Sequence, residues 1–126
     1  MSVQDHLPGC HLILDHFGGQ YAKDAEVLEA ALHAAARKAG ATVVDSKFHH
    51  FGEGGGVTGV VLLAESHISI HTWPELEYAA IDIFMCGTAD AHIAAKHLEE
   101  TLRPDFVKLT EVTRAPHRNQ WSQPAL

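Results

Sequence analysis

The chain has 126 residues, 46% of them hydrophobic, and a formal net charge of -7 at pH 7, which fits one globular domain with a modest core. The acidic balance opposes nucleic-acid binding, which needs a basic face, and suits a cationic small-molecule substrate. Neither an apolar run of about 18 residues nor a signal-peptide pattern is present, so we expect a cytoplasmic protein without a membrane partner.

The first half of the chain predicts a strand, a helix and a hairpin. Residues 11–16 alternate loosely before a Gly-Gly turn, as a strand does. Asp24 can cap a helix with one apolar stripe, and Gly40 can end it. Residues 42–51 and 57–64 are rich in β-branched and aromatic residues and flank a glycine run, which predicts a hairpin with a flexible tip.

The extended pattern continues into the second half of the chain. Apolar and polar residues alternate over 68–71 until Trp73-Pro74 turns the chain. Residues 78–85 alternate in the same way and predict a further strand.

Helical spacing returns after this strand. Thr88 or Asp90 can cap a helix that Pro104 stops. Residues 106–112 predict a last strand, and a polar tail over 113–126 is expected to be peripheral.

This order of elements predicts an α+β two-layer sandwich. Its mostly antiparallel sheet would have both helices on one face. Ala and Ile residues on the outward side of the strands that begin at Val57 and Tyr78 favour dimerisation through the uncovered sheet faces.

The segment 64–75 carries an unusual density of reactive groups for a strand. Ser66 is either a strand-end hydroxyl bonded to its neighbours or a reactive group. A hydrolase nucleophile is disfavoured, because Ser66 lacks the strand-to-helix elbow on which such a serine lies. The Ser66 hydroxyl can attack the carbonyl of Glu65 to form an ester, and elimination then leaves a dehydroalanine that hydrolyses to an N-terminal pyruvoyl group. That reaction needs a strained peptide, an oxyanion donor and an imidazole. His71 is a candidate imidazole, although five strand residues span about 16 Å.

Histidines and cysteines of the chain do not indicate a metal site. His67 and His71 are about 13 Å apart along a strand and lack a third ligand, so we expect no metal. Cys10 and Cys86 form no CxxC pair, which argues against a structural zinc site or a disulfide scaffold. Cys86 is then either a small buried residue or a thiol that delivers a proton.

Two motifs identify a family resemblance. Residues 65–75 read Glu-Ser-His-Ile-Ser-Ile-His-Thr-Trp-Pro-Glu, and residues 78–87 read Tyr-Ala-Ala-Ile-Asp-Ile-Phe-Met-Cys-Gly. Together they closely resemble the prokaryotic S-adenosylmethionine decarboxylase proenzymes, of the small pyruvoyl-dependent type. Residues 48–51 and 56–61 add supporting matches, and the resemblance covers about residues 9–112.

The resemblance implies a self-processing carboxy-lyase of polyamine biosynthesis. The chain would cleave itself between Glu65 and Ser66 into a β chain, 1–65, and an α chain, 66–126, and Ser66 would become a covalent pyruvoyl cofactor. That carbonyl would form a Schiff base with S-adenosyl-L-methionine and act as the electron sink for its decarboxylation. The product would be the aminopropyl donor for spermidine.

The resemblance also implies roles for single residues. His71 would transfer a proton during processing, Cys86 would be the catalytic proton donor, and Thr58 stands where the family usually has a processing serine. Phe51 would stack on adenine, and Glu75 would hold the ribose hydroxyls. The family implies a homodimer or higher homo-oligomer with active sites between subunits.

Departures from the family pattern keep two other functions open. Cys10 interrupts the usual start of the first strand, and Met85 replaces a common threonine beside the catalytic thiol. A pyruvoyl-dependent arginine or ornithine decarboxylase on the same scaffold is therefore the alternative. A further alternative is an unprocessed, non-catalytic homologue that binds a ligand.

Overall fold

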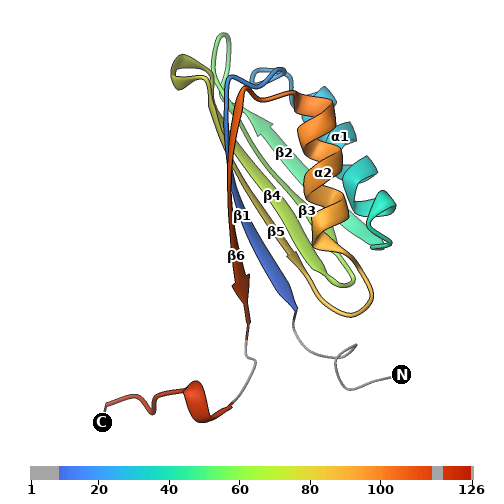
Figure 1. The fold of residues 1–126 in the computed structure, drawn as a ribbon. Helices are drawn as coiled ribbons and strands as arrows, with labels where there is room; N and C mark the ends of the chain where they lie inside the picture. Colours follow the sequence, from blue (N-terminus) through green and yellow to red (C-terminus); the bar gives the residue numbers. More distant parts are fainter. Residues whose placement is uncertain (1–8, 115–117, 126) are drawn as a thin grey trace.

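A computed structural model describes residues 9–114 and 118–125, and Figure 1 shows two helices lying against one face of a single sheet. The elements are β1 (Cys10–Phe17), α1 (Ala25–Lys38), β2 (Val43–His50), β3 (Val57–Leu63), β4 (Ser66–Trp73), the 3-10 helix η2 (Pro74–Leu76), β5 (Tyr78–Met85), α2 (Ala91–Leu102), β6 (Phe106–Thr113) and the 3-10 helix η3 (Arg118–Gln120). Among the described residues, neither α1 nor α2 has the length and hydropathy needed to cross a membrane.

The six strands follow the order β2-β3-β4-β5-β1-β6, and every neighbouring pair is antiparallel. Strands β2 to β5 form a meander, and β1 lies between β5 and the edge strand β6. The predicted α+β two-layer sandwich is confirmed, with an antiparallel sheet throughout the described part of the chain.

The helix boundaries follow from their caps. Asp24 accepts a hydrogen bond from the Val27 N–H at 3.1 Å and starts α1. Asp90, rather than Thr88, caps α2 by accepting from the His92 N–H at 2.9 Å. The helices bury their apolar faces against the inward side chains of the sheet, so the two layers share one core.

A two-residue turn divides the extended run that the sequence suggests. Ala64 and Glu65 connect β3 to β4, and Leu63 pairs directly with Ser66 across the hairpin. The turn contains no Gly, Asn or Asp, so the usual sequence signal for a tight hairpin is missing. Ser66 is consequently the first residue of β4 and lies at the end of the sheet where this hairpin turns.

The uncovered face of the sheet differs from the prediction. Ile81 and Ile83 are 1% and 0% exposed and lie under the helices, so the expected row of isoleucines on the open side of β5 is wrong. Directly paired residues share a face, which places a set of exposed apolar side chains on the open side. These are Phe17, Leu62, Trp73, Phe106 and Val112.

A buried histidine makes the stability of this fold depend on pH. His16 is 1% exposed, and neither ring nitrogen has a hydrogen-bond partner among the described residues. Burial lowers the pKa of this imidazole below the ordinary value of 6.5, although the carboxylate of Asp15 acts in the opposite direction. His16 is therefore neutral in the folded protein at neutral pH.

We expect the protein to lose stability as the pH falls below about 6.5. In that range the unfolded chain protonates His16 and the folded chain does not, so protons favour unfolding. The thermal midpoint should fall more between about pH 8 and about pH 5 in the wild type than in His16→Leu, which cannot titrate. Equal losses in the two proteins would show that His16 does not contribute.

Candidate active site

The residues predicted for the site form two groups at opposite ends of β4. This strand begins at Ser66 and contains His71 five positions later, so the two side chains are separated by about 16 Å in one chain. We call the first group the cleavage end and the second the pocket end. The cleavage end contains Glu65, Ser66 and Cys86, and the pocket end contains Phe51, Thr58, His71 and Glu75.

At the cleavage end, two hydrogen-bond donors point at one carbonyl. The carbonyl oxygen of Glu65 accepts from the backbone N–H of Cys86 at 3.2 Å and from its thiol at 3.0 Å. The register of the sheet produces this contact, because Ser66 pairs with Met85 and the next residue is Cys86. Donors in these positions polarise the carbonyl and stabilise negative charge that develops on its oxygen during attack.

The backbone at this carbonyl is strained. Ser66 has φ = +142°, a conformation that L-residues rarely adopt. Such conformations cost on the order of 1–3 kcal/mol and persist only where the surroundings impose them. Here the Glu65 carboxylate accepts from the Thr42 N–H at 2.9 Å, and the Ala64 N–H donates to the Thr42 carbonyl at 2.9 Å. These bonds hold the turn, so the strain is concentrated next to the Glu65–Ser66 bond.

The pocket end is a hollow of about 370 Å³ at the other end of β4. Thr58 and His71 are directly paired across β3 and β4, and the threonine hydroxyl lies 3.1 Å from Nδ1 of the imidazole. This bond fixes the orientation of the ring. The pocket is lined by Phe51, Gly55, Gly56, Thr58, His71, Thr72, Trp73 and Glu75.

A buried threonine, which the sequence did not single out, holds the glycine tip against this pocket. The Thr72 hydroxyl accepts from the Val57 N–H at 2.8 Å and donates to the Ala22 carbonyl at 2.6 Å. A Cβ at Gly56 would collide with the Thr72 carbonyl, so glycine is needed for this close approach. The position of Thr72 directly before the Trp-Pro turn was the sequence signal that could have indicated this role.

Aromatic side chains beside the pocket were also missed. Trp73 is 40% exposed and stacks on Tyr78 with ring centroids 5.4 Å apart. Tyr78 donates its hydroxyl proton to the Asp15 carboxylate, and this bond, with burial, raises the pKa of Tyr78 to about 12. The ring is therefore held in place as a neutral phenol. His67, by contrast, lies near Phe84, with ring centroids 6.1 Å apart, and does not line the pocket.

Comparisons with known proteins identify relatives of this chain. A family model described as S-adenosylmethionine decarboxylase matches residues 10–115. An S-adenosylmethionine decarboxylase proenzyme of Thermodesulfovibrio yellowstonii is 39% identical over 117 residues, which are 89% of this chain and 86% of the relative. The proenzyme of Methanococcus vannielii is 43% identical over 112 residues, covering 84% and 88% of the two chains.

A solved structure is similar over nearly the whole chain. It is the crystal structure of the adenosylmethionine decarboxylase from Aquifex aeolicus, which superposes with a TM-score of 0.80 at 32% identity. The match covers 94% of this chain and 99% of that one.

Proposed function

This chain belongs to the S-adenosylmethionine decarboxylase family, and from that premise we propose that it cleaves itself at Glu65–Ser66 and decarboxylates S-adenosyl-L-methionine. The observation that carries the proposal is the Glu65 carbonyl, which accepts two hydrogen bonds from Cys86 beside a strained Ser66. Cleavage there gives a β chain, 1–65, and an α chain, 66–126. The peripheral tail predicted for residues 113–126 stays a proposal, since β6 continues to Thr113 and residues 115–117 and 126 lie outside the described residues.

The chemistry of cleavage uses groups that the fold already places together. The Ser66 hydroxyl oxygen bonds to the Glu65 carbonyl carbon, the amide C–N bond breaks, and the freed nitrogen takes the hydroxyl proton. A base then removes the Ser66 Hα, and the ester C–O bond breaks, so the backbone carboxylate of Glu65 leaves as the new C-terminus of the β chain. The remaining dehydroalanine reacts with water, releases ammonia and becomes an N-terminal pyruvoyl group. Relief of the Ser66 strain and the Cys86 donors both favour the first step.

The pyruvoyl group supplies an electron sink for decarboxylation when it is present. Cys86 stays beside position 66 after cleavage, because β4 and β5 remain paired. Its thiol can then donate a proton to the carbon that has lost CO2. One side chain therefore serves both reactions, first as a hydrogen-bond donor and later as an acid.

A second copy of the chain completes the site. His71 lies about 16 Å along the same strand from its own Ser66, beyond the reach of a proton transfer. When two uncovered faces pack about a two-fold axis perpendicular to β4, the pocket end of each copy faces the cleavage end of the other. The exposed rings of Phe17, Trp73 and Phe106 on that face are then buried. We propose a homodimer, or a higher oligomer built from it, with each active site shared between subunits.

Two inactive variants should restore cleavage to one another. Neither Ser66→Ala nor His71→Ala should be processed alone. In a mixed dimer, the intact Ser66 of the His71→Ala copy faces the intact His71 of its Ser66→Ala partner. We therefore expect co-expression to produce cleaved His71→Ala chains, identified by mass.

The matched control removes the only intact imidazole at that position. Co-expression of His71→Ala with the double variant Ser66→Ala/His71→Ala should leave every chain uncut. Mixed dimers that form without any cleavage would contradict the shared site, and efficient processing of His71→Ala alone would remove His71 from that role.

The pocket end favours a nucleoside-bearing substrate. Phe51 is 63% exposed and presents a ring for stacking on adenine, and the exposed carboxylate of Glu75 suits ribose hydroxyls. Arginine or ornithine would leave these groups without partners, although a decarboxylase for either amine remains the alternative. The product of the proposed reaction is the aminopropyl donor for spermidine synthesis. The protein would thus act on a small molecule in the cytoplasm.

Release of CO2 from S-adenosyl-L-methionine, arginine and ornithine, measured side by side with processed protein, tests the substrate. We expect turnover of S-adenosyl-L-methionine and at most trace turnover of the two amino acids. Robust turnover of arginine or ornithine alone would favour the alternative. An uncut chain that binds S-adenosyl-L-methionine without turnover would favour the non-catalytic homologue.

A further inference from the structure

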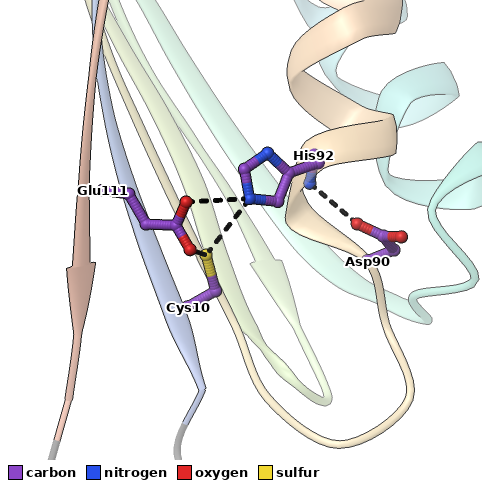
Figure 2. A network of polar contacts seen from close by, with 4 residues as sticks. All are labelled: Cys10, Asp90, His92 and Glu111. Carbon is purple, nitrogen blue, oxygen red and sulfur yellow. Dashed lines mark hydrogen bonds and ion pairs between the residues drawn. The ribbon is translucent and has the colours of Figure 1, made fainter.

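Three side chains of types that can ligate a metal ion, from distant parts of the sequence, converge outside the active site. Figure 2 shows Cys10 at the start of β1, Glu111 on β6 and His92 in the first turn of α2. Their ligand atoms all lie within 4.8 Å of one another. Nε2 of His92 is 3.1 Å from Oε1 of Glu111, and the Cys10 sulfur is 3.5 Å from Oε2 and 4.0 Å from Nε2.

The fold holds these three groups in a defined arrangement. Glu111 pairs with Leu12, a core residue, so its side chain is on the sheet face that carries the helices. Cys10 is two positions before Leu12 on β1 and has the same facing. The Asp90 cap fixes the backbone of His92 through the 2.9 Å bond drawn in Figure 2. Strands β1 and β6 and the N-terminus of α2 therefore meet at this site.

We propose that Cys10, His92 and Glu111 form a binding site for a divalent transition-metal ion, with Zn²⁺ as the preferred occupant and water as its fourth ligand. Tetrahedral zinc with ordinary bond lengths separates sulfur from nitrogen or oxygen by about 3.6 Å and nitrogen from oxygen by about 3.4 Å. The observed sulfur–nitrogen separation is 4.0 Å, and the contacts of 3.5 and 3.1 Å join the sulfur to Oε2 and the nitrogen to Oε1 of Glu111. With one oxygen of Glu111 as ligand, the three ligand atoms lie within 4.8 Å of one another, so the carboxylate must rotate to bring that oxygen to the ion. Small side-chain rotations close the site.

The donor set also decides which ions fit. A thiolate and an imidazole favour zinc and its neighbours in the first transition row, whereas Mg²⁺ and Ca²⁺ require oxygen ligands. Without metal, burial and the carboxylates of Glu111 and Asp90 raise the pKa of Cys10 to about 11, and the thiol is protonated. Binding therefore replaces one thiol proton with the metal and releases that proton to solvent.

The ion would tie an exposed edge of the sheet to the rest of the fold. All residues of β6 are exposed, and this strand pairs only with β1 among the described strands. A metal bridge from β6 to β1 and α2 stabilises the folded state, because the unfolded chain does not hold the three ligands together. Cys10 pairs with Met85, which pairs with Ser66, so the ion lies about two strand spacings, about 10 Å, from the cleavage end.

Cobalt titration of the chelator-treated full chain tests the site. Co²⁺ should bind one ion per chain and give a thiolate-to-cobalt charge-transfer band, and Zn²⁺ should displace it. Cys10→Ser should abolish that band, and His92→Ala should weaken binding at least about tenfold. Zn²⁺ should also raise the thermal midpoint of the wild type, and Mg²⁺ should leave it unchanged.

Two variants serve as matched controls. Cys86→Ser removes the other thiol of the chain, and His97→Ala removes another imidazole of α2; both should keep the band. The proposal is overturned if the wild type gives no charge-transfer band, if Cys10→Ser retains it, or if Cys86→Ser loses it. Should Cys10→Ser fail to fold, the half-exposed His92 provides the decisive variant, and undiminished binding by His92→Ala overturns the proposal.

Discussion

We expect Ser66→Ala to stay in one piece and to lose all decarboxylation. Alanine has no hydroxyl to attack the Glu65 carbonyl, so neither the ester nor the pyruvoyl group forms. The strained backbone and the two Cys86 donors remain, but they act on a carbonyl that has no nucleophile. A denaturing gel should show one band of 13.7 kDa for Ser66→Ala and two smaller bands for the wild type.

The matched control for this variant is Ser69→Ala, in the same strand. Ser69 pairs with Val60 and Asp82 and lies three residues from the cleavage bond, outside both ends of the site. We expect it to be processed like the wild type. Cleavage of Ser66→Ala at position 65 would show that the Ser66 hydroxyl is not the nucleophile.

Replacing Cys86 with alanine should separate the two reactions. The Glu65 carbonyl loses the thiol donor at 3.0 Å but keeps the backbone N–H at 3.2 Å, so the chain still cleaves, more slowly than the wild type. Turnover should fall by about 10²- to 10⁴-fold, the range typical of a lost general acid. Cleavage is followed by mass, and CO2 release is normalised to the fraction of processed chains.

A serine at position 86 provides the comparison. Its hydroxyl can donate to the Glu65 carbonyl, so Cys86→Ser should cleave faster than Cys86→Ala while its turnover stays low. Wild-type turnover in processed Cys86→Ala would mean that another group protonates the product. Complete loss of cleavage in that variant would mean that the thiol, rather than the N–H, is the essential donor.

Local signals were sufficient to predict most of the fold. Asp24 caps α1 as predicted, and alternating apolar residues mark the strands that pack under the helices. The hairpin turn at Ala64 and Glu65 was not predictable in the same way, because neither residue has the turn preference of Gly or Asn. Its geometry depends on the pairing of β3 with β4 and on the bond from Ala64 to Thr42, the residue just before β2.

The motifs selected residues for the site but could not determine where each would lie. Cys86 reaches the Glu65 carbonyl only because Ser66 pairs with Met85, and that register is a property of the assembled sheet. The same sheet keeps Ser66 and His71 apart, which is the physical reason to propose a shared site.

The proposed metal site was beyond the reach of sequence spacing. The expectation of no metal came from His67 and His71, which lie on one strand and do not converge on an ion. Cys10 and Glu111 are 101 positions apart in the chain, and they meet only because β6 pairs with β1. This convergence depends on which strands pair in the sheet, and the local sequence pattern does not indicate that pairing.

The intact mass of the purified wild-type chain tests the central claim most directly. We predict two chains, 1–65 and 66–126, with the second lighter than its amino-acid sequence by one ammonia, because Ser66 has become a pyruvoyl group. A single mass of 13.7 kDa under all conditions would contradict self-cleavage. A second chain that retains an N-terminal serine would contradict the pyruvoyl chemistry.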